Sequence, residues 1–223
     1  MYLITGASKG IGKYLRERFQ QEGAEVAGTC HTTVDDSSLT RMDVSDFDQV
    51  QEWIGSLESR LNNIVLINCA AINQNGFAHK TDPDQWRNVI NVNLIGTYNV
   101  IRAMLPIMRR QRYGRIINFS SVVAQIPTPG VSAYAASKAA LWGLTRSIAT
   151  ENAAMGITAN CLNLGYFDIG IIREVPAIFL DDIKKRIPSG TLGKPEDIYR
   201  TIKHIIETPY INGTAIDLNA GMV

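Results

Sequence analysis

Residues 1–12 read Met-Tyr-Leu-Ile-Thr-Gly-Ala-Ser-Lys-Gly-Ile-Gly, and the order of residue types in this stretch decides the fold. The apolar residues 1–5 predict a short buried strand, the glycines that follow predict a tight turn, and residues 11–21 have the apolar spacing of an amphipathic helix. A strand, a glycine turn and a helix in that order leave backbone N–H groups free at the positive end of the helix, where a pyrophosphate can bind. A glycine pattern alone is often only a turn, but this one has the required flanks.

The rest of the chain continues the alternation of strands and helices. Strands are expected near residues 2–5, 24–30, 39–42, 63–68, 115–120, 157–162 and 214–218, and helices near 11–22, 46–60, 84–111, 132–154 and 195–207. Continuous apolar strands such as residues 64–67 indicate a parallel sheet that is covered on both faces. We therefore expect an α/β fold, a doubly wound parallel sheet of about seven strands, forming a single domain over residues 1–223. Too few residues lie between the second strand and Asp43 for a crossover helix and a strand, so we expect a short loop there.

Length and composition agree with this interpretation. The 223 residues are 45% hydrophobic, enough for a sizeable core, and the net charge of +1 provides no electrostatic basis for binding nucleic acid or a membrane surface. No apolar run reaches the ~18 residues of a membrane span, and the first predicted strand leaves no room for a signal segment. Cys30, Cys69 and Cys161 are scattered, and we expect buried apolar side chains in a reducing cytoplasm rather than disulfides. No cluster of His, Cys and carboxylates has metal-ligand spacing, so no metal site is expected.

A second group of residues is typical of proton transfer. Tyr134 and Lys138 are four positions apart on a predicted helix and therefore point from the same face. A phenol has a pKa near ~10, and a positive charge beside it favours the phenolate, which brings the group closer to the range where general acid–base catalysis is efficient. Ser121, at the end of a predicted strand facing that helix, can hydrogen-bond the same substrate oxygen. A tyrosine and a lysine at this spacing also occur by chance, with the tyrosine as an ordinary packing residue.

Taken together, these motifs resemble the short-chain dehydrogenase/reductase family over essentially the whole chain. The family's glycine pattern matches Thr5, Gly6, Gly10 and Gly12, and its catalytic residues match Ser121, Tyr134, Lys138 and Asn93. The resemblance implies a Rossmann-type oxidoreductase in which Ser121 orients a carbonyl oxygen and Tyr134 gives it a proton. Lys138 is implied to hold the nicotinamide ribose and to lower the pKa of the tyrosine, and Asn93 to hold a water molecule linked to the lysine.

The resemblance also implies which residues contact a dinucleotide: Thr5, Gly6, Ser8, Lys9, Gly10, Ile11, Gly12, His31, Thr32, Asp43, Val44, Asn68, Ala70, Tyr134, Lys138 and Gly165. Folds that prefer NAD place a carboxylate about 20 residues after the glycines, on the ribose 2′-hydroxyl. Residues 28–34 carry hydroxyl groups and a histidine here, with no acid before Asp35. Lys9 lies where NADP-preferring members often carry a basic residue, and a phosphate gains from such donors. We therefore expect NADP, with NAD as the alternative if Asp35 or Asp36 folds back toward the ribose.

The chain departs from the family pattern at several turns. The usual Asn-Asn-Ala-Gly after the fourth strand is replaced by residues 68–71, Asn-Cys-Ala-Ala, which costs little if φ stays negative. The usual Pro-Gly after the sixth strand is Leu164-Gly165, and Ile169 replaces the threonine that commonly holds the nicotinamide amide. The penultimate Gly-Gly is Ala220-Gly221. These changes affect the surroundings of the cofactor and leave the four catalytic residues intact.

The substrate is less well determined by the sequence. Residues 166–190 fall where the family carries a mobile substrate lid, and their apolar side chains indicate a hydrophobic pocket, although apolar residues at helical spacing more often serve packing. The nearest branch is that of the 3-oxoacyl-acyl-carrier-protein reductases, which residues 114–123 and 192–198 resemble. Arg112 matches one of the two basic residues with which that branch docks the acidic acyl carrier protein, and Met155 replaces the other. We expect reduction of a 3-oxoacyl thioester, with a free ketone, sugar or secondary alcohol as the alternative.

Two further expectations concern assembly and the loss of catalysis. Family members commonly form homotetramers through the helix after Pro83 and the helix that carries Tyr134, and the second of these is more apolar than one buried face requires. Self-association as a dimer or tetramer is therefore expected. The alternative to an enzyme is a nucleotide-binding or scaffold protein that kept the fold and lost catalysis. Degenerate catalytic residues are its signature, and all four are intact here.

Overall fold

A parallel sheet forms the centre of the molecule. The computed structural model describes residues 1–32 and 36–223, and its seven strands stand in the order β3-β2-β1-β4-β5-β6-β7 with every neighbouring pair parallel. The strands are β1 (Tyr2–Thr5), β2 (Val26–Cys30), β3 (Leu39–Arg41), β4 (Val65–Asn68), β5 (Gly114–Ser121), β6 (Ile157–Leu164) and β7 (Ala215–Leu218). The predicted doubly wound α/β sheet is confirmed. Its strand order reverses between β1 and β4, and such folds bind ligands at the carboxyl ends of the strands beside that point.

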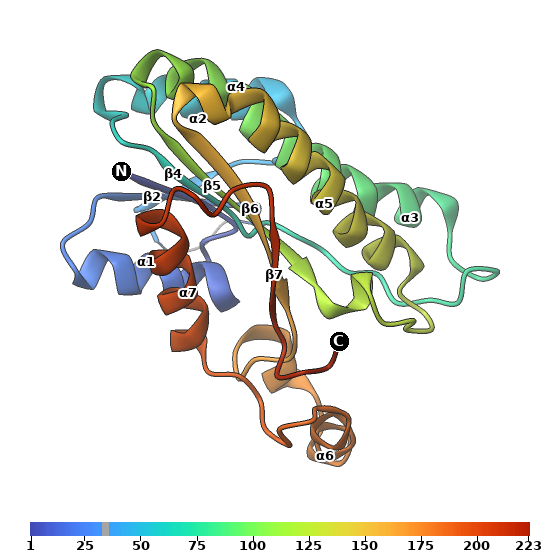
Figure 1. Cartoon of the computed structure of the whole chain (residues 1–223). Coiled ribbons are helices and arrows are strands. Elements are labelled where there is room, and N and C mark those ends of the chain that lie inside the picture. Colours follow the sequence, from blue (N-terminus) through green and yellow to red (C-terminus); the bar gives the residue numbers. More distant parts are fainter. Residues whose placement is uncertain (33–35) are drawn as a thin grey trace.

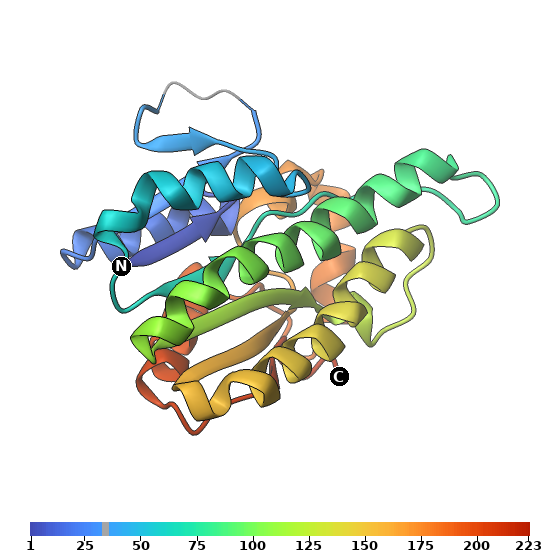
Figure 2. The same cartoon turned by 90° about the horizontal axis from the view of Figure 1, so that it is seen from above.

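Helices cover both faces of the sheet (Figure 1). They are α1 (Gly10–Gln21), α2 (Phe47–Leu57), α3 (Pro83–Ile90), α4 (Gly96–Gln111), α5 (Ser132–Asn152), α6 (Ala177–Arg186) and α7 (Pro195–Glu207). Helices α2, α4 and α5 lie on one face, and α1 and α7 on the other (Figure 1). Helix α3 and the first turns of α5 reach beyond the arrowheads of the strands (Figure 2). The carboxyl ends of the strands are therefore flanked by helices on the side where a ligand is expected.

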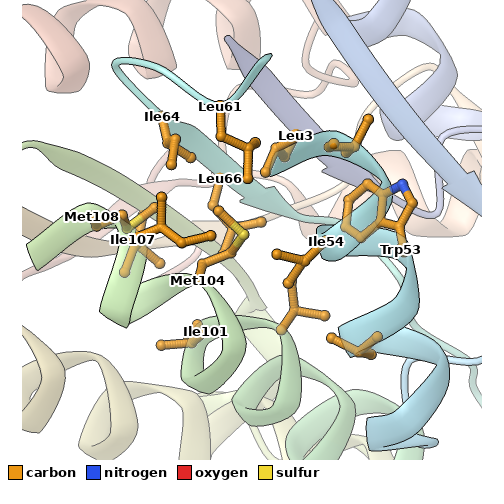
Figure 3. Packing of buried hydrophobic residues seen from close by; sticks show 14 of the residues in the cluster. Leu3, Trp53, Ile54, Leu61, Ile64, Leu66, Ile101, Met104, Ile107 and Met108 are labelled. Atoms are coloured by element: carbon orange, nitrogen blue, oxygen red, sulfur yellow. The ribbon is translucent and has the colours of Figure 1, made fainter. Parts of the chain in front are cut away.

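The core consists of two apolar layers, one on each face of the sheet. Successive strand residues point to opposite faces, so Leu3 and Leu66 pack in the layer beneath α2 and α4, whereas Ile4 and Ile67 pack in the layer beneath α1 and α7. Figure 3 shows Leu3 and Leu66 in the first layer, together with Trp53 of α2. Because both faces are apolar, the central strands are buried on both sides, as the continuous apolar runs in the sequence predict.

The connection between β2 and β3 has no helix in its described residues, 31–32 and 36–38. Thr33, Val34 and Asp35 lie outside the described residues. β3 has only three residues, so the chain must return only on the order of 10 Å before it can pair in parallel with β2. A short loop is sufficient for that distance, in agreement with the prediction.

The long helix predicted over residues 84–111 is interrupted in its middle. α3 passes into a π-helical turn at Asn91–Ile95, and α4 begins at Gly96. The prediction of one continuous α-helix is therefore wrong in this detail. The turn places the Asn93 side chain against the loop after β4, and the Thr97 hydroxyl donates a hydrogen bond to the Asn93 carbonyl at 2.8 Å. Single π turns of this kind are frequent at functional sites.

Candidate active site

Three of the predicted catalytic residues lie together at the carboxyl end of β5. Ser121 is the last residue of that strand, and its hydroxyl accepts a hydrogen bond from the backbone N–H of Val123 at 3.4 Å. Tyr134 and Lys138 lie in the first turns of α5, and the Lys138 ammonium is 5.4 Å from the centre of the Tyr134 ring. The strand end and the helix thus bring a hydroxyl, a phenol and an ammonium to one place.

Lys138 is buried and is held by the backbone of β5. Its Nζ donates a hydrogen bond to the carbonyl oxygen of Phe119 at 2.7 Å. Burial disfavours the charged form and lowers the pKa of Lys138 from its ordinary value of 10.5 to about 8, against a smaller opposing effect of the Cys161 and Cys69 thiols. The lysine can therefore gain and lose a proton near neutral pH.

The Tyr134 phenol lies in surroundings that favour its neutral form. Burial raises the pKa of Tyr134 above its ordinary value, while the Ser121 hydroxyl lowers it by a smaller amount. The sequence predicts that Lys138 lowers the pKa of Tyr134, whereas in this structure the pKa is raised. Burial is the larger effect on the phenol, and the Lys138 ammonium donates its hydrogen bond to the Phe119 carbonyl.

Asn93, the fourth predicted catalytic residue, lies in the π-helical turn and is fully buried. Its amide oxygen accepts a hydrogen bond from the backbone N–H of Ile72 at 2.8 Å. Its amide nitrogen donates to the Ile72 carbonyl at 2.9 Å and to the Ser137 hydroxyl at 3.1 Å. Asn93 therefore connects the loop after β4 to the helix that carries Tyr134 and Lys138.

The glycine turn after β1 forms a cradle that side chains would fill. Gly6 has φ of +65°, and a Cβ there would lie 2.9 Å from the backbone nitrogen of Ala70. A Cβ on Gly12 would lie 2.3 Å from the carbonyl oxygen of Gly6. The Thr5 hydroxyl accepts hydrogen bonds from the backbone N–H groups of Cys69 and Ala70, both at 3.1 Å, and so fixes the end of β4 beside the turn. The backbone can therefore approach a pyrophosphate closely, as a dinucleotide requires.

The first turn of α1 faces the same cradle. Lys9 is the N-cap residue, and among the described residues no side chain caps the helix and no acidic residue occupies its first turn. Gly10 has φ of +55°, and Ile11 follows it at the helix start. Ser8 is half-buried and Lys9 is exposed. Free backbone N–H groups at a positive helix end, with a lysine beside them, fit the phosphates of a dinucleotide.

The ends of β2 and β3 carry the residues expected beside the adenosine ribose. His31 and Thr32 are exposed, and His31 Nε2 lies 3.7 Å from a carboxylate oxygen of Asp43. The guanidinium of Arg41 donates a hydrogen bond to the His31 carbonyl at 3.3 Å. Arg41 could not be identified from the sequence, because only the pairing of Cys30 with Arg41 between the two strands brings it to this position.

Asp36, one of the two acids that argue for NAD, is held by other residues. Arg16 Nη1 lies 2.6 Å from its carboxylate, and the backbone N–H of Ser38 donates to it at 3.0 Å. Hydrogen bonds from Ser38 and Arg16 hold the pKa of Asp36 at about 2, so the group is a carboxylate that is already paired. The other acid, Asp35, lies outside the described residues.

The remaining predicted contact residues lie at the carboxyl ends of the central strands. A carboxylate oxygen of Asp43 accepts hydrogen bonds from the backbone and the hydroxyl of Ser45, and Val44 is buried. Asn68 donates to the amide oxygen of Asn118 at 2.8 Å, while its own buried amide oxygen has no partner within the described part of the chain. At Gly165 a Cβ would lie 2.8 Å from Asn219 Cα, so only glycine fits there.

The comparisons with known proteins agree with this geometry. Residues 1–177 match the family model of short chain dehydrogenases. The chain belongs to the short-chain dehydrogenase family. This short-chain dehydrogenase is 35% identical to an acetoacetyl-CoA reductase from Shinella zoogloeoides, over 98% of the chain and 96% of the relative. It is 34% identical to the 3-oxoacyl-[acyl-carrier-protein] reductase FabG of Thermotoga maritima, over 99% of the chain and 96% of the relative. Among solved structures, ligand-free aldohexose dehydrogenase from Thermoplasma acidophilum superimposes with a TM-score of 0.91 at 30% identity, covering 99% of this chain and 92% of that one.

The segment predicted as the lid of this short-chain dehydrogenase contains a 3₁₀ turn, Gly170–Glu174, and α6. A cavity of about 140 Å³ lies at its base and is lined by Tyr166, Phe167, Ile187, Thr191, Gly193, Asp197, Leu218, Asn219 and Ala220. Neither Ser121 nor Tyr134 lines this cavity. Ile178 of α6 is 73% exposed, whereas the side chains of Ile171 and Phe179 lie outside the described part. This segment therefore presents apolar surface at Ile178.

In the part of the chain that the structure describes, no helix is long and apolar enough to cross a membrane. Within residues 1–32 and 36–223, no three side chains of His, Cys, Asp or Glu come together in a way that could hold a metal ion. The three cysteines are free thiols.

Proposed function

We propose that this protein is a cytoplasmic, NADP-dependent reductase of 3-oxoacyl thioesters. The observation that carries the proposal is the meeting of Ser121, Tyr134 and Lys138 at the carboxyl end of β5, on the same edge of the sheet as the glycine cradle after β1. A bound nicotinamide dinucleotide would supply the hydride for a substrate carbonyl carbon. The chain itself must then bind the carbonyl oxygen and deliver a proton to it.

The residues of the site divide that work among them. The Ser121 hydroxyl holds the carbonyl oxygen by a hydrogen bond, and the Tyr134 hydroxyl gives that oxygen a proton as negative charge develops. Burial keeps Tyr134 protonated before the reaction, which suits a proton donor. Lys138 holds the nicotinamide ribose and resupplies the proton, since its pKa of about 8 allows exchange near neutral pH. Asn93 is proposed to hold a water molecule that links Lys138 to solvent.

The choice of NADP rests on the charges near the predicted 2′-phosphate. Lys9 and Arg41 provide cationic groups there, and His31 and Thr32 are exposed beside them. The nearby Asp36 is paired with Arg16 and Ser38, and the Asp43 carboxylate, 3.7 Å from His31, accepts hydrogen bonds from Ser45. A phosphate is favoured by free cations and is repelled by an unpaired carboxylate, so the balance of described charges supports NADP over NAD.

The thioester substrate is supported by the relatives and by a basic groove. A groove of about 450 Å³ is lined by Arg112, Arg115 and Tyr210 among other residues, and no carboxylate occurs among its described lining residues. Arg112 precedes β5, whereas Ser121 ends it, so roughly 25 Å of strand separate them. A carrier protein bound at Arg112 is therefore proposed to serve the active site of a neighbouring copy of the chain.

Self-association belongs to the same proposal. Ile95 and Tyr98, in the π-helical turn and α4, are each 43% exposed and lie about one helical turn apart, so together they offer an apolar contact surface. We propose that this face contacts another copy in a dimer or a tetramer. Light scattering of the purified chain tests this, and a monomer at all concentrations contradicts it.

A free aldose is the second candidate substrate, because the aldohexose dehydrogenase superimposes closely on this chain. Nicotinamide absorbance with acetoacetyl-CoA and NADPH, compared with an aldohexose and NADP, separates the two substrates. Turnover of the thioester supports the first candidate, and turnover of the sugar alone supports the second. Replacing NADPH with NADH in the same assay tests the cofactor preference.

A further inference from the structure

A row of polar side chains crosses the sheet directly behind the catalytic serine. Ser120 of β5 stands opposite Asn163 of β6, and Asn163 stands opposite Asp217 of β7. Residues in register on neighbouring parallel strands point to the same face, so the three side chains form one line across the sheet. Asn163 is only 1% exposed, although apolar residues usually occupy such positions.

Both N–H groups and the oxygen of the Asn163 side-chain amide make hydrogen bonds. Its nitrogen donates to a carboxylate oxygen of Asp217 at 2.7 Å and to the side-chain oxygen of Gln125 at 3.0 Å. Its oxygen accepts from the indole N–H of Trp142 at 3.0 Å. A buried amide that lost these partners would pay the full desolvation cost, since water cannot reach it. The orientation of this side chain is therefore fixed.

Two of these bonds lead to the catalytic residues. The indole N–H of Trp142 is shared with the Ser120 hydroxyl, also at 3.0 Å, and that hydroxyl donates to the Lys138 carbonyl at 2.8 Å. Gln125 follows the 3₁₀ turn that begins immediately after Ser121. Asn163 thus hydrogen-bonds both Trp142 of helix α5 and Gln125, the residue that ends the turn after Ser121.

We propose that Asn163 is a positioning residue that sets the distance between Ser121 on the strand and Tyr134 on α5. The proposal rests on the proposed proton-transfer function of that site. One side of Asn163 holds the helix through Trp142, and the other side holds the turn after Ser121 through Gln125. A displacement of about 1 Å at such a site can reduce the rate of reaction ~10²-fold without loss of ligand binding. Asn163 therefore governs turnover rather than cofactor affinity.

The proposal can be tested by exchanging the amide of Asn163 on β6 with the carboxylate of Asp217 on β7. Asn163→Asp places a second carboxylate against Asp217 and removes the donor to Gln125, so we expect kcat to fall about 10- to 100-fold while the Kd for NADPH stays within about 3-fold. The double variant Asn163→Asp with Asp217→Asn restores one amide and one carboxylate across the two strands, and the Gln125 side-chain amide can then turn to donate its N–H to the new carboxylate at position 163. It should recover kcat to within about 5-fold of the wild type.

Asn160→Asp is the matched control. Asn160 is an equally buried amide on the same strand, but in the described part of the chain its side chain bonds the turn before β7, through the Ile211 carbonyl and the Thr214 backbone, and neither α5 nor the turn after Ser121. This variant should lower Tm and keep kcat. Trp142→Phe retains a ring on α5 and removes only the indole donor, and we expect it to reduce kcat about 3- to 10-fold with little change in Tm.

The outcomes separate this inference from the function on which it rests. A wild type that reduces no carbonyl substrate overturns the proposed function. An active wild type with unchanged kcat in Asn163→Asp overturns the positioning role alone, and so does a folded double variant that fails to recover. If Asn163→Asp does not fold, Trp142→Phe decides: a reduced kcat with unchanged Kd for NADPH supports the role, and an unchanged kcat overturns it.

Discussion

The ammonium of Lys138 donates a hydrogen bond to the carbonyl oxygen of Phe119 at 2.7 Å. This hydrogen bond joins helix α5 to strand β5, two residues before Ser121. The burial of Lys138 has a thermodynamic cost, because a buried ammonium is less stable than a solvated one. The same burial lowers the pKa of Lys138 to about 8, where the lysine can exchange protons.

The first prediction concerns the dependence of stability on pH. Because the pKa of Lys138 falls from 10.5 to about 8 on folding, the unfolded state binds more protons than the folded state between these values. The free energy of unfolding of the wild type should therefore rise, by roughly 3 kcal/mol relative to Lys138→Met, as the pH increases from 8 to 10.5. Urea denaturation of both proteins across this range measures it. Parallel curves for the two proteins would show that Lys138 titrates normally.

The second prediction concerns the glycine cradle. Gly6→Ala places a Cβ 2.9 Å from the Ala70 backbone at a φ of +65°, so we expect a loss of about 1–3 kcal/mol in stability and weaker NADPH binding. Gly55→Ala is the matched control, because Gly55 lies in α2 with open space around its Cα. That change should stabilise the protein by about 0.5–1 kcal/mol through helix propensity. Equal effects of the two substitutions would refute the steric argument.

The third prediction concerns the choice of cofactor. Lys9→Ala removes an exposed cation beside the predicted phosphate sites, so the Kd for NADPH should rise about 10-fold and the Kd for NADH about 3-fold or less. Fluorescence titration at low and high salt measures both constants, and the NADPH effect should shrink as salt screens the charge. A similar increase for both cofactors would mean that Lys9 contacts the shared pyrophosphate only.

The fourth prediction concerns carrier-protein docking. Arg112→Glu should weaken binding of an acidic acyl carrier protein at least about 10-fold at low salt, and less at high salt. Met155→Arg should strengthen carrier-protein binding, because the Met155 side chain lies beside Arg112. The Met155 sulfur is 3.8 Å from a guanidinium nitrogen of Arg112. Arg110→Glu, in the last turn of α4 two residues before Arg112, is the control, since Arg110 is exposed and pairs with Glu58. Carrier binding that responds equally to Arg110 and Arg112 would indicate general charge attraction without a docking site.

Much of the fold could be predicted because its signals are local. The strand, glycine turn and helix of residues 1–21 appear in the structure nearly as expected, since each depends on residue types that are adjacent in the chain. The π-helical turn at Asn91–Ile95 could not be predicted in this way. It depends on hydrogen bonds that Asn93 makes to Ile72 and Ser137, which lie on other elements.

The same distinction applies to the candidate site. Tyr134 and Lys138 could be placed together because four residues make about one helical turn. The pKa of Tyr134 could not be predicted, because it depends on burial by the whole fold. Arg41 and Asn163 were missed because their partners lie on neighbouring strands, and only the register of the sheet brings them together.

The central claim is that Tyr134 gives the substrate oxygen its proton. Its most direct test is the rate of NADPH consumption with acetoacetyl-CoA for the wild type and Tyr134→Phe, together with the Kd for NADPH of each. We predict that the variant binds NADPH within about 3-fold of the wild type and loses a factor of about 10²–10⁴ in kcat. A Phe variant that turns over at the wild-type rate would contradict the role of Tyr134, and a wild type that binds NADPH but consumes none with any carbonyl substrate would indicate a nucleotide-binding protein without catalysis.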